Sequence, residues 1–259
     1  MLNIIILGDN IMKNIYLNTE SLSWKVFIKY FILATLLLVS FIFMKRFGII
    51  RIAAEILCNL VLGGLNVFMI IQIINPKLNS CIVEELSFRS ESLSVIIVPI
   101  LIAAITRIFT NFLQVMPVLF GGRVVGIAKG QMNLSSFNPI ERIFVGTIVG
   151  PFFEEFLFRV VFFVTITYIL EYFDNKFNYS ISERVFDLRS VICWIIIIAD
   201  NILFSLSHIP NIGNFHLYFI GGVVDTIVYI KYGFYASWLS HGFYNYFRFA
   251  FIFTLLGVS

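Results

Sequence analysis

The sequence predicts an all-α fold, a polytopic transmembrane helical bundle with about seven spans. Of its 259 residues, 59% are hydrophobic and only 13% are charged. A soluble domain carries about 25% charged and about 45–50% apolar residues. This composition cannot supply a polar shell, so the surplus apolar surface must face lipid. We therefore expect an integral, multi-pass membrane protein with membrane lipid around it.

Apolar stretches of about 20 residues, the length that crosses a bilayer, follow one another along the chain. The block 93–120 contains Pro99, Arg107 and Pro117, so it is either one long kinked span or a span followed by an interfacial helix. The polar stretch 77–92 is expected to be a loop or interfacial segment, and 121–142 a loop. The other expected spans run from about 26–44, 53–74, 143–172, 191–208, 217–230 and 235–256.

Charge and cysteine usage exclude several classes of protein. The net charge is +3 and the basic residues are scattered, so no basic face for nucleic acid is expected. The three cysteines Cys58, Cys81 and Cys193 have no metal-type spacing and are interpreted as packing residues. The N-terminus has no basic region before its short apolar run, which is untypical of a signal peptide, and Met12 is an alternative start.

Ionisable and amide side chains interrupt the last four spans. An ionisable group at the bilayer centre costs about 2.5–3.5 kcal/mol or more. The free-energy cost of several such groups falls only if they contact one another or water, so one shared polar cavity is expected. The residues concerned are Glu154, Glu155, Arg159, His208, Asp225, His241 and Asn245.

The segment PFFEEFLFR places two glutamates next to each other. Glu155 and Arg159 are four residues apart and share a helix face, so they are expected to pair. Glu154 points about 100° away and has no local cation. Glu154 is therefore the better candidate for chemistry.

Two histidines lie on later spans. His208 follows Phe204 by one helical turn, and Asn201 precedes His208 by seven residues on a similar face. His241 and Asn245 lie one turn apart on the last span. A single buried histidine is usually a packing residue, but two of them with a free glutamate and an asparagine favour a functional site.

These side chains limit the chemistry. Glutamate and histidine activate water by general acid–base catalysis, and His241 with Asn245 are candidate donors to an oxyanion. Glu154, His208 and His241 are also ligands that Zn²⁺ or another divalent metal accepts, although no HExxH motif is present. A metal-activated water is left as an alternative.

In its order of motifs the sequence resembles the CPBP family, the CAAX proteases and bacteriocin-processing enzymes also called the Abi family. The pattern EExxxR, FxxxH and HxxxN is matched by Glu154-Glu155 to Arg159, Phe204 to His208, and His241 to Asn245. The resemblance implies an intramembrane endopeptidase, described as metal-dependent or as using glutamate-activated water.

The resemblance also implies roles and a division of the chain. Glu154, His208, His241 and Asn245 would form the catalytic set, with Glu155 and Arg159 supporting it. Residues 143–259 would be the catalytic transmembrane core, and 1–142 spans and loops without diagnostic motifs. The expected substrate is a membrane-associated peptide, a prenylated protein, or a pheromone or bacteriocin precursor.

Two further groups need an interpretation. Glu84-Glu85 to Arg89 also fits EExxxR, but it is expected in a solvated loop, so replacing both glutamates with Gln should leave activity nearly unchanged. Arg248 shares a helix face with His241 and Asn245. It is a candidate guide for an anionic part of the substrate, against the alternative that it snorkels to the membrane surface.

Two other function classes compete with the peptidase. One is a non-enzymatic immunity or adaptor protein that keeps the polar cavity. The other is an ion-coupled transporter, because intramembrane acids and histidines also mark ion pathways. The complete motif set favours the enzyme, and the chain lacks the repeated halves typical of many transporters.

Overall fold

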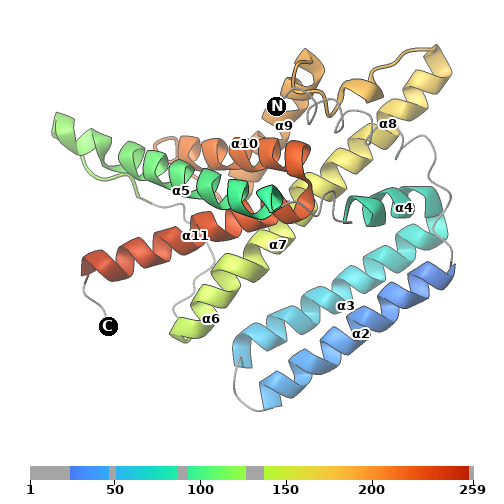
Figure 1. Ribbon diagram of the computed structural model, residues 1–259, viewed down its shortest axis with the longest axis horizontal. Coiled ribbons are helices and arrows are strands. Elements are labelled where there is room, and N and C mark those ends of the chain that lie inside the picture. The colour runs from blue at the N-terminus through green and yellow to red at the C-terminus, as the bar shows by residue number, and fades with distance from the viewer. Residues whose placement is uncertain (1–23, 47–50, 87–92, 127–136, 257–259) are drawn as a thin grey trace.

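The computed structural model describes residues 24–46, 51–86, 93–126 and 137–256, and within these ranges every regular element is helical (Figure 1). The predicted all-α fold is therefore confirmed. The alternative start at Met12 lies outside the described residues.

The first helices follow the predicted spans closely. Helices α2 (Trp24–Arg46) and α3 (Arg51–Ile74) pack side by side at one edge of the molecule (Figure 1). Helix α5 (Ser94–Val115) keeps Pro99 inside it and continues into the 3₁₀ helix η1 (Met116–Phe120). The block 93–120 is thus one long helical stretch rather than a span with a separate interfacial helix.

Part of the expected polar loop is a helix, α4 (Pro76–Glu85). The Asn75 side chain accepts a hydrogen bond from the Leu78 N–H at 3.1 Å, and Pro76 occupies the first helical position. This is a strong helix start, because the cap satisfies an N–H that has no partner within the helix. The helix buries Cys81 and Ile82 in the core, which a solvated loop would not do.

One helical stretch, Pro139–Phe177, runs diagonally through the molecule (Figure 1). It begins earlier and ends later than the predicted span 143–172, because Asn138 and Glu141 form a capping box and Asn178 ends it in the left-handed conformation. Two π-helical segments interrupt it. Its successive parts are α6 (Pro139–Phe144), π segment η3 (Val145–Val149), α7 (Gly150–Glu155), π segment η4 (Phe156–Val161) and α8 (Phe162–Phe177).

The last three helices agree with the predicted spans to within two residues. They are α9 (Val191–Ser207), reached through the short 3₁₀ helix η5 (Ser182–Arg184), α10 (Phe215–Tyr232) and α11 (Phe234–Leu256). Only Gly233 separates α10 from α11, and its φ of 89° is a conformation that favours glycine. The two helices therefore pack against each other as a tight hairpin, with α5 against both.

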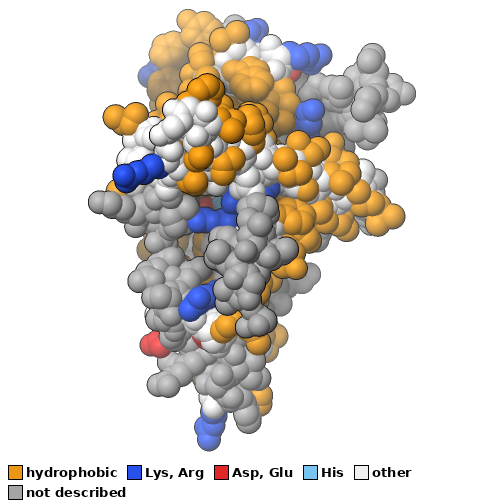
Figure 2. All heavy atoms as spheres, turned by 90° about the vertical axis from the view of Figure 1, so that its left-hand side faces the viewer, with side chains coloured by type: hydrophobic (Ala, Val, Ile, Leu, Met, Phe, Trp, Pro, Cys, Tyr) orange, Lys and Arg blue, Asp and Glu red, His pale blue; other side chains and the backbone are white. Residues whose placement is uncertain are grey.

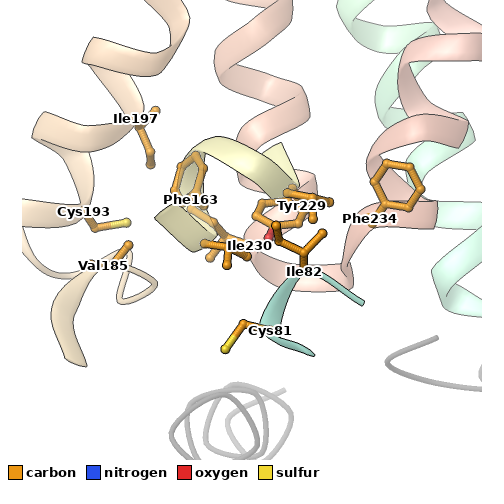
Figure 3. Close-up of a cluster of buried hydrophobic side chains, with 11 residues drawn as sticks. Cys81, Ile82, Phe163, Val185, Cys193, Ile197, Tyr229, Ile230 and Phe234 are labelled. Atoms are coloured by element: carbon orange, nitrogen blue, oxygen red, sulfur yellow. The ribbon is translucent and has the colours of Figure 1, made fainter. Parts of the chain in front are cut away.

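The hydrophobic core joins α4 to the C-terminal helices (Figure 3). Cys81 and Ile82 of α4 meet Phe163 of α8 and Tyr229 of α10. Cys193 is also buried in this cluster and forms no disulfide, as a packing residue should. Helix α4 lies in the part of the chain without diagnostic motifs, and it thus helps to support the C-terminal half.

The outer surface is apolar, as a lipid-facing protein requires. Large hydrophobic side chains are exposed along α3, α5 and α9. Figure 2 shows hydrophobic side chains gathered over much of the coloured surface on one face. Within the described residues, three helical stretches have the length and hydropathy of a membrane span: Leu57–Ile74, Ser94–Phe120 and Pro139–Phe177. The prediction of about seven spans remains a prediction.

Adjacent glycines on α10 provide a test of this packing. A methyl group on Gly222 would collide with Asn201 Oδ1 and lie 2.8 Å from Phe204 Cδ1, whereas one on Gly221 would meet nothing within 4 Å. We expect Gly222→Ala to lower the melting temperature in detergent, with an overpacking cost of about 1–3 kcal/mol. Gly221→Ala is the matched control and should be neutral or slightly stabilising. Equal melting temperatures for the two variants would contradict this α9–α10 contact.

Candidate active site

The carboxylate of Glu154 lies between two imidazole rings. Its Oε2 is 3.6 Å from Nε2 of His208 and 3.6 Å from Nε2 of His241. This oxygen is shielded from solvent and has no hydrogen-bond partner among the described residues. The predicted convergence of these three side chains is therefore present. A separation of 3.6 Å is too long for a direct hydrogen bond but suits a bridging water or ion.

Both histidines are turned so that Nε2 faces Glu154. Nδ1 of His208 is 2.9 Å from the Phe204 carbonyl oxygen, and Nδ1 of His241 is 2.8 Å from Glu155 Oε1. A carbonyl and an ionised carboxylate only accept hydrogen bonds, so this geometry assigns the proton of each neutral ring to Nδ1. The lone pair of each Nε2 is then directed towards Glu154.

Glu155 is fully buried and orients His241. The predicted ion pair is present, with Glu155 Oε2 3.2 Å from Arg159 Nε. The Ser237 hydroxyl donates to the same carboxylate. The two adjacent glutamates thus have different surroundings, because Glu155 is held by three partners while Glu154 faces the histidines.

Arg159 has partners that the sequence did not predict. Its guanidinium pairs with Asp200 and donates to Asn201 Oδ1 at 3.3 Å and to the Gly222 carbonyl at 3.1 Å. Asn201 also accepts from Arg159 and donates to the Thr226 hydroxyl. An acid inside the apolar span of α9 was the available signal for Asp200, because such a group needs a cation.

Asp225 and His241 face each other across the α10–α11 hairpin. Each lies eight residues from Gly233, and Asp225 Oδ2 is 3.9 Å from His241 Nδ1. Glu155, Asp225 and His241 therefore present ligand atoms within 4.8 Å of one another. Hydrogen bonding already accounts for this group, since Nδ1 of His241 donates to Glu155. An ion at this group would have to replace that hydrogen bond, because one Nδ1 cannot carry a proton and bind a metal at the same time.

Asn245 does not reach the glutamate. Its amide donates to the Gly146 carbonyl at 2.9 Å, and among the described residues it makes no hydrogen bond to Glu154, His208 or His241. Gly146 O is available because the Gly150 N–H bonds to Val145 and residue 151 is a proline without an N–H. The structure therefore places the Asn245 amide against π segment η3 and not in direct hydrogen-bond contact with Glu154.

Helix α11 docks on three successive carbonyls of η3. Trp238 Nε1 donates to Ile148 O at 2.9 Å, and Asn245 bonds to Gly146 O. Between them Gly242 lies so close to Thr147 O that an added Cβ would collide with it. This contact fixes the turn that precedes Glu154 against the helix that carries His241.

The second EExxxR match is not in a solvated loop. Glu85 ends helix α4, is only 2% exposed, and accepts a hydrogen bond from the Tyr229 hydroxyl at 2.8 Å. Glu84 is half-buried, and desolvation together with the neighbouring Glu85 carboxylate raises its pKa. The predicted solvation is wrong for Glu85, because α4 turns this residue onto α10.

Fold and site together define an integral membrane protein whose helices place the partly exposed side chain of Glu154 between two histidines. The model of the type II CAAX prenyl endopeptidase Rce1-like family matches residues 136–247. Over this segment the chain is similar to the CPBP family of membrane proteases, to which that model belongs. No curated protein and no solved structure shows a significant match.

Glu85 and Glu84 differ in a way that stability measurements can detect. Glu85→Ala would leave the buried Tyr229 hydroxyl without its acceptor, so we expect it to lower stability by about 1–3 kcal/mol. Glu84→Ala is the matched control and should cost less. Thermal unfolding of both purified variants gives the comparison, and a larger loss for Glu84→Ala would contradict the assignment.

Proposed function

We propose that this protein is an intramembrane endopeptidase that hydrolyses a peptide bond with water activated by Glu154. The observation that carries the proposal is the position of Glu154 Oε2, shielded from solvent and 3.6 Å from Nε2 of both histidines. The carboxylate is a base with no hydrogen-bonded partner among the described side chains, and a water bound to it would also lie within reach of either ring. Such a group in a low-dielectric site is suited to general-base catalysis.

The reaction follows from this geometry. Glu154 takes a proton from water while the water oxygen forms a bond to the peptide carbonyl carbon. The C–N bond then breaks, and the proton held by Glu154 passes to the leaving nitrogen. A histidine that carries a second proton, at Nε2, is an imidazolium and would donate a hydrogen bond to the oxyanion. Glu155 keeps the His241 ring oriented, so we assign it a positioning role.

Glu154 and each histidine are also spaced like two ligands of one divalent metal. Two ligands of a tetrahedral zinc, each about 2.0–2.1 Å from the ion, lie roughly 3.4 Å apart, which is close to the observed 3.6 Å separations. Each histidine also donates its Nδ1 proton to an oxygen, the usual support for a metal-bound ring. Glu154, His208 and His241 would hold the ion, which would activate water. Metal analysis of wild-type protein beside Glu154→Gln tests this.

The proposed substrate is a membrane-associated protein or peptide. The site lies on apolar helices, so the peptide must reach it from the membrane or its surface. The family description, a CAAX prenyl endopeptidase, favours a lipid-modified or otherwise membrane-bound protein over a soluble one. Asn245 is proposed as a positioning residue that ties η3 to α11, because its amide bonds to Gly146.

The central test is Glu154→Gln. The change keeps the side-chain shape but removes the base, so we expect peptide cleavage to fall by at least about 10²-fold, within the usual contribution of general-base catalysis. The melting temperature should change little, because Glu154 has no buried ion pair to lose. Cleavage by purified protein, and comparative peptidomics of cells with each form, are the measurements.

A matched control is Glu183→Gln, which makes the same change at an exposed position of the 3₁₀ helix η5. It should cleave like the wild type. Retention of full activity by Glu154→Gln would overturn the proposed function.

Glu155→Gln should behave differently. It leaves Arg159 with one fewer carboxylate in a fully buried place, and breaking one side of a buried ion pair costs about 3–5 kcal/mol. We expect a lower melting temperature together with reduced activity, since His241 loses its orienting acceptor. A double-mutant cycle with Arg159→Gln measures the coupling. Normal stability of Glu155→Gln, or additive losses in the cycle, would contradict this role.

A further inference from the structure

Two asparagines lie on the lipid-facing side of helix α3. Asn59 and Asn66 fall within the apolar stretch Leu57–Ile74, of which only 11% is buried. Both side chains are exposed, and neither amide makes a hydrogen bond to another residue that the structure describes. Asn66 is in the middle of this 18-residue stretch, so it lies deep in the hydrocarbon layer. An amide without a hydrogen-bond partner is costly there.

The two amides lie along the midline of one exposed helix face. Asn59 and Asn66 are seven residues apart, which is about two helical turns and roughly 10 Å along the axis. Residues at intervals of three, four and seven share a helix face. The exposed residues that these intervals place around the asparagines are Leu62, Gly63, Ile70 and Ile73. Helix α3 therefore turns one continuous stripe outward, with polar groups at its centre.

Exposed polar groups on the neighbouring helix α2 are satisfied within that helix. The hydroxyls of Thr35 and Ser40 each donate to the carbonyl oxygen four residues earlier, at 2.8 and 2.9 Å. A hydroxyl has one proton, and one turn of helix supplies its acceptor. A primary amide has two N–H donors and an acceptor oxygen, so one helix cannot complete the hydrogen bonds of Asn59 or Asn66. The bonds that remain must come from another molecule.

The opposite side of α3 is occupied by the protein's own core. Phe68 is nine residues from Asn59, half a turn away around the helix. Its ring stacks on the Phe156 ring with centroids 6.0 Å apart, and Phe156 follows Glu155 directly. The asparagine face therefore points away from the candidate active site, at the edge of the molecule where α2 and α3 lie (Figure 1).

We propose that this face is the interface of a homodimer, in which α3 of one copy packs in parallel against α3 of a second copy. Two copies inserted in the same orientation are related by a two-fold axis along the membrane normal, so each residue meets its own copy at the same depth. Asn59 then faces Asn59, and Asn66 faces Asn66. An amide is both donor and acceptor and is complementary to itself. Such pairs hold membrane helices together.

Two observations favour a second copy over an unrelated membrane helix. The seven-residue interval between the asparagines is the repeat that keeps two parallel helices in contact, and α3 carries it on both sides of the interface. A helix with a single amide would satisfy one asparagine and leave the other unpaired. The space beside Gly63 is also open, since an added Cβ would meet nothing within 4 Å. A small residue at this place lets two helices approach closely.

Disulfide cross-linking in the membranes of cells that express the protein tests the arrangement. The background is Cys58→Ala, because Cys81 and Cys193 are buried. Leu62→Cys lies on the exposed face between the asparagines and should give a covalent dimer on mild oxidation. Val61→Cys, the matched control, lies on the opposite side from Asn59 and should give at least about tenfold less.

Removal of the amides should weaken the dimer and leave each copy folded. For Asn59→Leu combined with Asn66→Leu, we expect the association constant, measured by energy transfer between labelled copies on dilution in lipid, to fall by about tenfold. Gly63→Leu should also weaken association, by bulk, and its Cβ meets nothing within one copy. Asn111→Leu makes the same change on α5 and should leave association unchanged. Melting temperatures show that each variant is folded.

Several outcomes would overturn the proposed dimer. They are a protein that stays monomeric at every lipid dilution, unchanged association of the double asparagine variant, cross-linking through Val61→Cys in preference to Leu62→Cys, and a Leu62→Cys adduct with a different protein in place of the dimer. None of these measurements uses peptide cleavage, so their failure would leave the proposed peptidase function untouched.

Discussion

The buried guanidinium of Arg159 is the interaction on which the rest of the site depends. It is 0% exposed and contacts Glu155 on its own helix, Asp200 on α9 and the Gly222 carbonyl on α10. A charge in so apolar a place is tolerated only with its counter-charges in position. Arg159 therefore fixes where α9 and α10 lie. Because Glu155 also accepts from His241, the same cation sets the orientation of that ring.

The backbone supplies a second constraint. Glu154 and Glu155 lie on the short segment α7, with a π-helical segment on either side. Each π segment shifts the register of the helix and leaves carbonyls without their usual donors. On η3 these carbonyls receive Trp238 and Asn245 of α11. The irregular helix thus brings its glutamates and His241 into one place at a fixed spacing.

The side chains buried at the site differ in kind from those buried in the rest of the bundle. Elsewhere the helices bury apolar side chains or expose them to lipid, whereas here carboxylates of Glu155, Asp200 and Asp225 are buried around one arginine. Such local conflicts are expected where function is selected over stability. Glu154 is the clearest example, since its Oε2 is shielded from solvent without a hydrogen bond.

The sequence alone determined the features that depend on near neighbours in the chain. Apolar stretches set the helices from α2 to α11, and four-residue spacing set the Glu155–Arg159 pair, because both follow from the geometry of a single helix. Packing between distant helices decided the rest. It gave Arg159 a second acid in Asp200, buried Glu85 against Tyr229, and directed Asn245 to Gly146 instead of Glu154. Spacing along one helix cannot specify these contacts, since they depend on how each helix is rotated and placed against its neighbours.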